Sequence, residues 1–414
     1  MAGKLPLVIV GASYAGTRLA ATARDLGYDA PIILLGEESH RPYQRPPLSK
    51  GLLAGSVAPD ELALWGEGFY ANHAIDLRSG VRATGIDPRA REVRLDDGSS
   101  LRYATLALTT GARCRTLAMA GAGLDGVFGL RSLDDALRLR AALADATRVC
   151  VIGGGFIGLE VAASARRRGL AVEVVESAPR LLARAVSPRL SSYLERAHRL
   201  RGVEVRLGRQ VRALRADAGR VVAAELDDGG SIACDVVVVG VGALPNVELA
   251  EQAGIATRNG IVVDGFGRTS APGVLAAGDV ASLAHVDGAG DASPPLRLES
   301  IHAANEGARA AASGLCGQMR AFGGVPWFWS DQYELKLQMA GLTRAGDTAV
   351  LRGDPEADRF SEFHLRDGRV VAAHSVNRPG EHMLARRWIE AGARIDARML
   401  ADTSVDLKGW QPTP

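Results

Sequence analysis

The stretch RVCVIGGGFIGLEVAASARRRGLAVEVVE, residues 148–176, decides the fold. It begins with an apolar run at 148–152, passes through a glycine turn at 153–158 and continues into an alanine-rich segment at 159–168. A second apolar run then ends at Glu176. This order predicts a strand, a tight turn, a helix and a parallel strand, which together make a βαβ unit.

The glycine turn has the spacing of a dinucleotide-binding site. Gly153 permits the tight turn, Gly155 lets the backbone approach a pyrophosphate, and Gly158 lets the helix pack closely on the strand. The phosphates then meet free N–H groups at the positive end of the helix. The Glu176 carboxylate can accept both ribose hydroxyls, and its charge would repel the 2′-phosphate of NADPH. With Ile157 inside the turn, these residues form the candidate NADH site.

A similar unit opens the chain. An apolar run leads into GASYAG, where Gly11 and Gly16 match the outer glycines of the second turn. Ser13 stands where the middle glycine is expected, and a serine fits there if its φ is negative. Glu37 follows the next apolar run, at the position that matches Glu176 in the other unit. We therefore expect a second dinucleotide site here.

The repeat extends beyond the glycine turns. LDDG occurs at 95–98 and again at 226–229, each time before an apolar run that leads into Gly-Ala. One nucleotide-binding architecture therefore occurs twice. The composition changes after about residue 320, and the remainder is expected to form strands at 360–365 and 370–375 and a helix at 382–391. The sequence thus predicts an α/β protein with two Rossmann-like dinucleotide-binding domains and a C-terminal α+β domain.

Composition excludes several classes of protein. The 414 residues are 47% hydrophobic and 23% charged, which is ordinary for a globular chain and unlike a disordered one. The net charge of +2 is too small for nucleic-acid binding by the whole surface. The longest apolar run, around 236–244, is too short to span a bilayer, and the first residues have no secretory signal. We expect a soluble cytoplasmic protein that binds neither nucleic acid nor a membrane.

The cysteines give no sign of a redox or metal site. The four of them, Cys114, Cys150, Cys234 and Cys316, lie far apart, and the sequence has no C-x-x-C motif. A dithiol pair, a zinc site and an iron–sulfur site are therefore unsupported, and we expect no metal. Cys150 and Cys234 fall in apolar, strand-like runs, where a buried and inert thiol is expected.

Two further segments have the composition of ligand-binding loops. Residues 41–50, RPYQRPPLSK, predict a rigid basic loop that contains Arg45 and Lys50. Residues 269–279, TSAPGVLAAGD, predict a turn and a short strand that end at Asp279. A carboxylate in that position is suited to binding a polyol.

Several motifs resemble those of the FAD-dependent, NADH-oxidising ferredoxin reductases of bacterial oxygenase systems, the putidaredoxin reductase type. They are RPPLSK (45–50), LRSLDDA (130–136), VIGGGFIGLEVAASA (151–165), GVGALPN (240–246), AAGD (276–279), LESIHAANEGA (298–308) and PWFWSDQYELKLQMAG (326–341). The last motif is the most specific, because other two-dinucleotide reductases lack it. The resemblance covers nearly the whole chain.

The resemblance implies a fold like that of glutathione reductase. An FAD-binding domain at 1–114 and 243–320 would be split by an NADH-binding domain at 115–242. A C-terminal domain at 321–414 would lie near the flavin. The FAD would be bound non-covalently.

The resemblance also implies particular site residues. By similarity the FAD contacts are Gly11, Ser13, Ala15, Gly16, Glu37, Arg45, Lys50, Ala83, Arg131, Asp279, Ile301 and Trp327. Ala83 and Ile301 would act through backbone groups, and Ala83 replaces a commoner valine. Lys50 and Glu160 would form a catalytic pair beside the flavin and the nicotinamide. Trp327 and Trp329 would either wall the flavin or belong to the core of the third domain.

The implied activity is that of an NADH:ferredoxin oxidoreductase. NADH delivers two electrons as a hydride, a ferredoxin accepts one at a time, and a flavin converts between the two. The Lys50 ammonium would stabilise the negative charge that arrives with the hydride. We expect an acidic two-iron two-sulfur ferredoxin as partner, and a monomer or weak homodimer. The ferredoxin would feed a haem-thiolate (cytochrome P-450) monooxygenase; the alternatives are the reductase of a Rieske dioxygenase and rubredoxin reductase.

Two other classes fit less well. A disulfide or peroxide reductase of this superfamily needs a flavin-facing cysteine, but Tyr43, Gln44 and Arg45 occupy that segment and the first cysteine is Cys114. An NADH-sensing binding flavoprotein of the apoptosis-inducing type usually has a targeting segment and long insertions, and we see neither in this sequence. Monodehydroascorbate reductase remains as a variant that differs in its acceptor.

Overall fold

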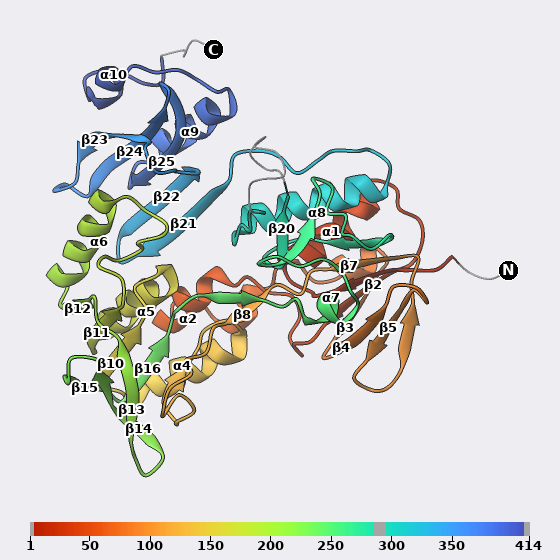
Figure 1. Ribbon diagram of the computed structural model, residues 1–414, viewed down its shortest axis with the longest axis horizontal. Coiled ribbons are helices and arrows are strands. Elements are labelled where there is room, and N and C mark those ends of the chain that lie inside the picture. Colours follow the sequence, from red (N-terminus) through yellow and green to blue (C-terminus); the bar gives the residue numbers. More distant parts are fainter. Residues whose placement is uncertain (1–3, 285–294, 410–414) are drawn as a thin grey trace. The chain divides into compact units, whose positions relative to one another are not determined.

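Figure 1 shows the computed structural model, which describes residues 4–284 and 295–409. The chain divides into two compact units. The first unit contains Met1–Gln44, Leu62–Arg113 and Leu244–Gly324, and the second contains Arg45–Glu61, Cys114–Ala243 and Val325–Pro414. The outermost residues of the predicted first and third domains, 1–3 and 410–414, lie outside the described part of the chain.

The first unit is built on a five-stranded parallel sheet with the order β19–β7–β1–β2–β3. Its strands are β1 (Leu7–Val10), β2 (Ile32–Gly36), β3 (Ile75–Ser79), β7 (Thr105–Leu108) and β19 (Val274–Ala276). Every residue of β1 and β2 is buried, as expected for parallel strands that are covered on both faces. Helices α1 (Tyr14–Asp25) and α8 (Ile301–Leu315) pack against each other.

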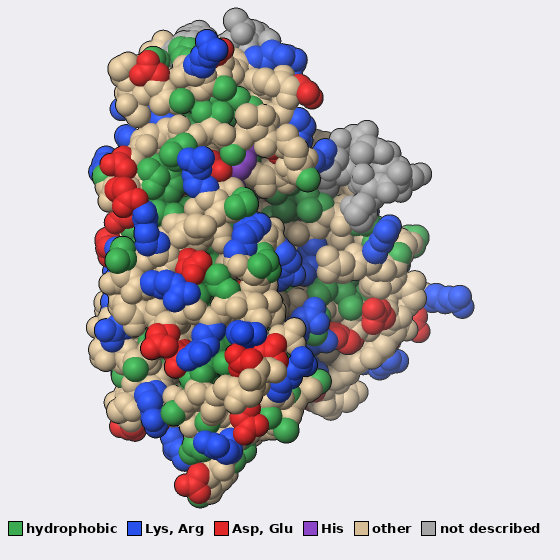
Figure 2. All heavy atoms as spheres, turned by 60° about the vertical axis from the view of Figure 1, so that its left-hand side comes forward, with side chains coloured by type: hydrophobic (Ala, Val, Ile, Leu, Met, Phe, Trp, Pro, Cys, Tyr) green, Lys and Arg blue, Asp and Glu red, His purple; other side chains and the backbone are tan. Residues whose placement is uncertain are grey.

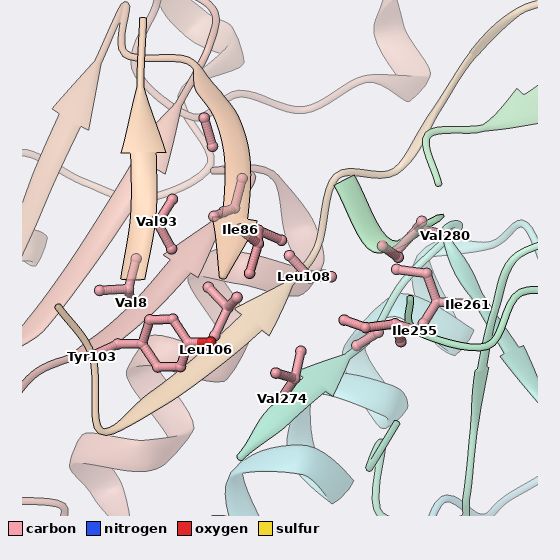
Figure 3. Close-up of a cluster of buried hydrophobic side chains, with 14 of the residues drawn as sticks. Val8, Ile86, Val93, Tyr103, Leu106, Leu108, Ile255, Ile261, Val274 and Val280 are labelled. Atoms are coloured by element: carbon pink, nitrogen blue, oxygen red, sulfur yellow. The ribbon is translucent and has the colours of Figure 1, made fainter. Parts of the chain in front are cut away.

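A small antiparallel sheet precedes β7 in the chain and contributes to the core of this unit. It consists of β4 (Ala83–Asp87), β5 (Glu92–Leu95) and β6 (Ser100–Arg102). Figure 3 shows its side chains meeting those of the parallel sheet, with Val93 and Ile86 near Leu106 and Leu108. Ile255, Ile261 and Val274 continue the same buried cluster.

Short elements complete the first unit. They are α3 (Phe69–Asn72), α7 (Glu248–Gln252) and the parallel pair of β18 (Ile261–Val263) and β20 (Ala281–Leu283). The 3-10 turn η2 (Pro59–Leu62) and the strands β8 (Ala112–Cys114) and β17 (Ala243–Pro245) lie where the chain passes from one unit to the other.

The second unit repeats this plan. Its five-stranded parallel sheet has the order β12–β11–β10–β16–β9. The strands are β9 (Val127–Phe128), β10 (Arg148–Ile152), β11 (Ala171–Glu176), β12 (Val203–Leu207) and β16 (Val236–Val239). The helices are α4 (Leu133–Asp145), α5 (Phe156–Arg167) and α6 (Pro188–Leu200), and the antiparallel sheet is β13 (Val211–Asp217), β14 (Arg220–Leu226) and β15 (Ser231–Ala233). The predicted repeat of one nucleotide-binding architecture is therefore present.

The last part of the second unit is a five-stranded antiparallel sheet with the order β21–β22–β25–β24–β23. Its strands are β21 (Trp327–Gln332), β22 (Leu335–Gly341), β23 (Thr348–Asp354), β24 (Arg359–Arg366) and β25 (Arg369–Val376). Helices α9 (Pro379–Glu390) and α10 (Ala397–Ala401) supply Trp388 and Leu400 to a buried cluster with Phe363 of the sheet. Two of these five strands were predicted.

Three predicted boundaries were wrong. The helix expected at 159–168 begins at Phe156, because Gly155 has an extended backbone (φ −83°, ψ 177°) and caps it, so half of the glycine motif is already helical. The helix expected at 382–391 begins at Pro379, since a proline is well suited to the first helical position. The expected loop at 41–50 ends in a 3-10 turn, η1 (Pro46–Ser49), which continues into α2 (Gly51–Ala54).

Candidate dinucleotide sites and the Lys50–Glu160 pair

The second glycine turn leaves space that the protein itself does not fill. A Cβ on Gly158 would lie 2.2 Å from the carbonyl oxygen of Gly153, so the packing of the helix on the strand requires this glycine. A Cβ on Gly155 would meet nothing closer than the carbonyl oxygen of Gly240, at 3.8 Å. Protein packing therefore leaves room beside Gly155 at the first turn of α5, and the contact with a pyrophosphate stays a prediction. Ile157, in the same turn, is 44% exposed.

Glu176 is held against this turn. Its Oε2 accepts a hydrogen bond from the backbone N–H of Gly154 at 2.7 Å, and its Oε1 accepts one from Ala178 at 2.7 Å. Each oxygen of a carboxylate has a second lone pair, so both can still accept a ribose hydroxyl. The predicted acid at the end of β11 is therefore placed and oriented for a nucleotide, and its contact with the ribose stays a prediction.

The first glycine turn has the same backbone but a different middle. A Cβ on Gly16 would lie 2.0 Å from the carbonyl oxygen of Gly11, matching the approach seen at Gly158. Ser13 is the N-cap residue of α1 with φ −117°, so the condition under which a serine fits there is met. Glu37 lies just past β2, and its side chain is 69% exposed, with Arg82 at 3.5 Å.

Other predicted FAD contacts surround the start of α1. A Cβ on Gly278 would lie 2.8 Å from the Cβ of Ala15, so the segment that carries Asp279 passes close to this helix end. Ala15 also packs with Ala304, one turn after the predicted Ile301 at the start of α8. Ala83 is buried and begins β4.

The remaining predicted FAD contacts belong to the second unit. Arg45 donates from Nη1 to the carbonyl oxygen of Arg131 at 2.6 Å, so the structure brings these two residues together. Trp327 stacks on Trp329 with ring centroids 5.3 Å apart, and the Arg386 guanidinium lies 5.2 Å from the Trp327 ring. Trp327 thus contacts Trp329 and Arg386 but is only part-buried and outside the buried core cluster of its domain, and its place beside a flavin stays a prediction.

Lys50 and Glu160 form an ion pair in the second unit. The Lys50 Nζ lies 2.7 Å from the Glu160 Oε2, and the side chains are 20% and 1% exposed. Glu160 follows Phe156 by four residues on α5, so its side chain lies one turn beyond the open glycine turn. The pairing that the resemblance implied is present, and the catalytic role of the pair stays a prediction.

Sequence reasoning missed the partners of this pair. The hydroxyl of Ser49 donates to Glu160 Oε2 at 2.5 Å, and that of Ser330 donates to Oε1 at 2.6 Å. Ser49 lies inside the RPPLSK motif beside Lys50, which was a usable signal. Ser330 is 170 residues away from Glu160, and only its position within the aromatic motif marked it.

The thiols lie in surroundings that do not favour a thiolate. Burial raises the pKa of Cys150 and, to about 11, that of Cys234, and both residues are fully buried in the core of the second unit. Burial also raises the pKa of Cys114 and Cys316. Since the thiolate is the reactive form, the prediction of inert thiols at Cys150 and Cys234 agrees with the structure. Within the described ranges there is no cluster of side chains that would hold a metal ion.

Two family descriptions match nearly all of this chain. The family described as pyridine nucleotide-disulphide oxidoreductase matches residues 5–308, and the one described as reductase C-terminal matches residues 327–410. The chain belongs to the pyridine nucleotide-disulphide oxidoreductase family. Across residues 4–284 and 295–409, no helix has the length and apolar character needed to cross a membrane.

Similar proteins extend over the full length of the chain. Rhodocoxin reductase of Rhodococcus erythropolis is 42% identical, over 98% of this chain and 94% of its own length. The anthranilate 1,2-dioxygenase system ferredoxin–NAD(+) reductase component of Burkholderia cepacia is 44% identical, over 97% of this chain and 98% of its own length. A solved ferredoxin reductase for the CYP199A2 system of Rhodopseudomonas palustris has a TM-score of 0.94 and 41% identity, over 97% of this chain and 98% of its own. The predicted fold class and the resemblance to ferredoxin reductases of bacterial oxygenase systems are confirmed.

Proposed function

We propose that this protein takes a hydride from NADH onto FAD and passes single electrons to a ferredoxin of an oxygenase system. The observation that carries the proposal is the Lys50–Glu160 ion pair, one helical turn beyond the open glycine turn. A fixed cation near a bound nicotinamide dinucleotide is suited to charge that moves with a hydride. The enzyme class is that of its family and relatives, which are oxidoreductases named for ferredoxin and NAD.

The proposed domain plan is the one that the family resemblance implies. The FAD-binding domain would comprise 1–114 and 243–320, the NADH-binding domain 115–242, and the C-terminal domain 321–414. Gly278 lies close to Ala15, so backbone and methyl groups border the space beside the start of α1. This fits a dinucleotide on the first turn. Asp279 would hold the ribityl chain there. Bound non-covalently, FAD supplies the exchange between two-electron and one-electron chemistry.

The residues of the second unit act on charge and orientation. Lys50 places an ammonium where negative charge develops during hydride transfer, and Glu160 fixes that ammonium through the 2.7 Å contact. Glu176 accepts the ribose hydroxyls of NADH while the amides of Gly154 and Ala178 hold its carboxylate. The same carboxylate repels a 2′-phosphate, which makes NADH the preferred donor over NADPH.

The physiological acceptor would be a small acidic ferredoxin with a two-iron two-sulfur cluster. The solved putidaredoxin reductase–putidaredoxin complex contains a chain 38% identical to this one, with a TM-score of 0.93. On the face in Figure 2, Lys and Arg side chains are interspersed with Asp and Glu. Opposite charges also pair in the structure, as Arg206 and Glu173 do at 2.7 Å. An acidic partner competes with these carboxylates, so docking should weaken as salt shortens the Debye length below about 8 Å.

The oxygenase that receives the electrons would be a haem-thiolate monooxygenase. A Rieske dioxygenase is the second candidate, favoured by the 44% identity to the reductase component of the anthranilate 1,2-dioxygenase system. A thiol relay is disfavoured, because burial raises the pKa of each of the four cysteines. We propose a monomer or weak homodimer as the acting species.

Anaerobic titration of the purified yellow holoprotein tests this function. One equivalent of NADH per FAD should bleach the flavin absorbance, and an oxidised two-iron ferredoxin of an oxygenase system should restore it. Ferricyanide reduction by NADH serves as the control, because it needs no docked protein and should respond little to salt. A flavin that NADH leaves oxidised would refute the proposal, and ferricyanide reduction without ferredoxin reduction would move the acceptor to rubredoxin or a small molecule.

A further inference from the structure

A chain of buried hydrogen bonds leads from Glu160 into the C-terminal sheet. Ser330 Oγ donates to Glu160 Oε1 at 2.6 Å, and Gln332 Nε2 donates to Ser330 Oγ at 3.1 Å. Gln332 Oε1 in turn lies 2.9 Å from His198 Nε2. These four residues are at most 2% exposed, although they come from helix α5, strand β21 and helix α6. Buried polar groups in such a chain are costly unless all are satisfied, so the arrangement is specific.

The secondary structure aligns the members of the chain. Residues two apart on a strand share a face, so Phe328, Ser330 and Gln332 point to the same side of β21. Residues four apart share a face of a helix, as Phe156 and Glu160 do on α5. The rings of Phe156 and Phe328 pack with centroids 4.8 Å apart, which sets the register that brings Ser330 to Glu160.

An aromatic ring contacts His198, at the far end of this series of hydrogen bonds. Tyr333, in the two-residue turn between β21 and β22, has its hydroxyl 3.4 Å from His198 Nδ1 and its ring edge-on to the imidazole at 5.1 Å. Its φ of +56° is uncommon for an aromatic residue, so the turn is held in this conformation by its surroundings. The Arg201 guanidinium also contacts the Tyr333 ring, at 5.0 Å from the ring centroid.

With Glu160 Oε1 as an acceptor, the donors and acceptors follow a single order. A carboxylate only accepts, so Ser330 gives it the single hydroxyl hydrogen and must accept from the Gln332 amide. The amide oxygen then faces His198, which must carry its proton on Nε2. The lone pair on His198 Nδ1 is left to accept from the Tyr333 hydroxyl.

A Glu160 that carried a proton on Oε1 would reverse this order. It would donate to Ser330, the Gln332 amide would have to flip, and His198 would carry its proton on Nδ1. The tautomer of His198 therefore reports the state of Glu160 from three hydrogen bonds away. Burial lowers the pKa of His198 to about 4, so the ring is neutral at pH 7 and both tautomers are available to it.

We propose that Ser330 and Gln332 are positioning residues, which keep the Glu160 carboxylate directed so that it fixes the Lys50 ammonium during hydride transfer. The inference rests on the proposed function. Gln332 makes a proton relay unsuitable, because an amide passes a proton only through an unfavourable tautomer. The chain therefore holds charge in place instead of conducting it.

Stopped-flow reduction of the flavin by NADH tests the proposal without any ferredoxin. In Ser330→Ala the limiting rate should fall about tenfold, while the apparent Kd for NADH changes less than about twofold. Gln332→Leu should lower the rate severalfold, and the nearly isosteric Ser330→Cys, a weaker donor, should fall between Ser330→Ala and the parent. The matched control is Ser361→Ala, which removes an equally buried hydroxyl of the same sheet that is bonded to Ser375 and does not contact Glu160.

The second readout does not depend on turnover. Side-chain nitrogen NMR of the holoprotein at pH 7 should show His198 neutral with its proton on Nε2. A proton on Nδ1, or a cationic ring, would overturn the proposal. So would a limiting rate in Ser330→Ala equal to that of Ser361→Ala, or an effect confined to NADH binding. If Ser330→Ala is unstable, Ser330→Cys and Gln332→Leu carry the test.

Failure of the proposal can be told from failure of the proposed function. If NADH does not reduce the flavin of the parent protein, the proposed function is wrong. If the parent is reduced and the Ser330 and Gln332 variants match Ser361→Ala, only the positioning role is wrong.

Discussion

The two glycine turns share a backbone and differ where a ligand would lie. Gly16 and Gly158 each face the carbonyl oxygen of the first glycine of their turn, with Cβ distances of 2.0 and 2.2 Å. In the middle, Ser13 carries a side chain, whereas Gly155 leaves open space. Protein packing therefore accounts for the outer glycines, and it does not require a glycine at the middle position of the second turn.

The acids that follow the two turns differ in the same way. Glu176 accepts two backbone N–H groups, one of them from its own turn, while Glu37 is 69% exposed beside Arg82. A carboxylate that is already oriented loses little entropy when a ribose binds, which suits a substrate that must be selected and released. A permanent cofactor on the first turn can draw its affinity from distributed contacts, such as those proposed for Asp279.

A charged side chain at position 155, beside the open space of the second turn, should have the largest effect. In Gly155→Asp, a carboxylate would stand about 4 Å from the proposed pyrophosphate, and like charges at that separation repel by about 4 kcal/mol at an effective dielectric of 20. We expect kcat/KM for NADH to fall at least about a hundredfold, with FAD still bound. Gly66→Asp, at an exposed glycine where a Cβ would meet nothing within 4 Å, is the control. An unchanged kcat/KM would show that NADH does not use this turn.

Removing the Asp279 carboxylate, which we propose binds FAD, should have the next largest effect. Losing a charged hydrogen bond costs roughly 1.5–3 kcal/mol, so Asp279→Ala should weaken FAD binding about 10- to 100-fold. Flavin retention through dialysis measures this directly, and Gly155→Asp should retain its flavin under the same conditions. If Asp279→Ala keeps FAD as well as the parent does, the assignment of Asp279 is wrong.

Local pattern was enough to predict both turns and the acids after them, because these residues lie within one βαβ unit. The resemblance supplied the Lys50–Glu160 pair, which joins residues 110 positions apart. The chain from Ser330 through Gln332 to His198 was not predicted, since it joins β21 to α5 and α6 across more than a hundred residues. A serine and a glutamine in a strand have no local signal that separates a buried hydrogen bond from a solvated side chain.

The two end-of-strand acids should have separable effects on coenzyme choice. Glu176→Ala should narrow the ratio of kcat/KM for NADH over NADPH about tenfold, chiefly by improving NADPH, because a repulsive charge has been removed. Glu37→Ala should leave the ratio unchanged, since it belongs to the proposed FAD turn. Steady-state kinetics with both coenzymes decides the matter, and an unchanged ratio in Glu176→Ala would place the discrimination elsewhere, for example at Arg184.

The smallest expected effect is a pH-dependent contribution to stability that the parallel sheet of the second unit has and that of the first unit lacks. Desolvation alone would raise the pKa of Asp235, but hydrogen bonds from the hydroxyl and backbone N–H of Thr147 and from the side chain and backbone N–H of Arg148, at the start of β10, hold it well below the ordinary value. Ala104 takes the matching place in the first unit. Because the folded pKa is lowered, this stabilisation is present at neutral pH and is lost as pH falls below about 4.

Asp235→Asn should therefore lower the free energy of unfolding by about 1 kcal/mol at pH 7, a modest value because the carboxylate is partly exposed. The difference from the parent should shrink as pH falls toward 3. Denaturant unfolding at both pH values measures it, with the exposed Asp217→Asn as control. A difference that grows in acid would contradict the sign of this linkage.

Electron delivery to a ferredoxin after NADH oxidation tests the central claim most directly. Mixed anaerobically with NADH and a two-iron ferredoxin of an oxygenase system, the holoprotein should reduce two ferredoxins per NADH, at a rate that falls as salt rises. Gly155→Asp should fail with NADH, yet pass electrons at the parent rate once its flavin has been reduced by dithionite. A parent protein whose flavin NADH reduces, but which transfers no electrons to any ferredoxin, would contradict the account.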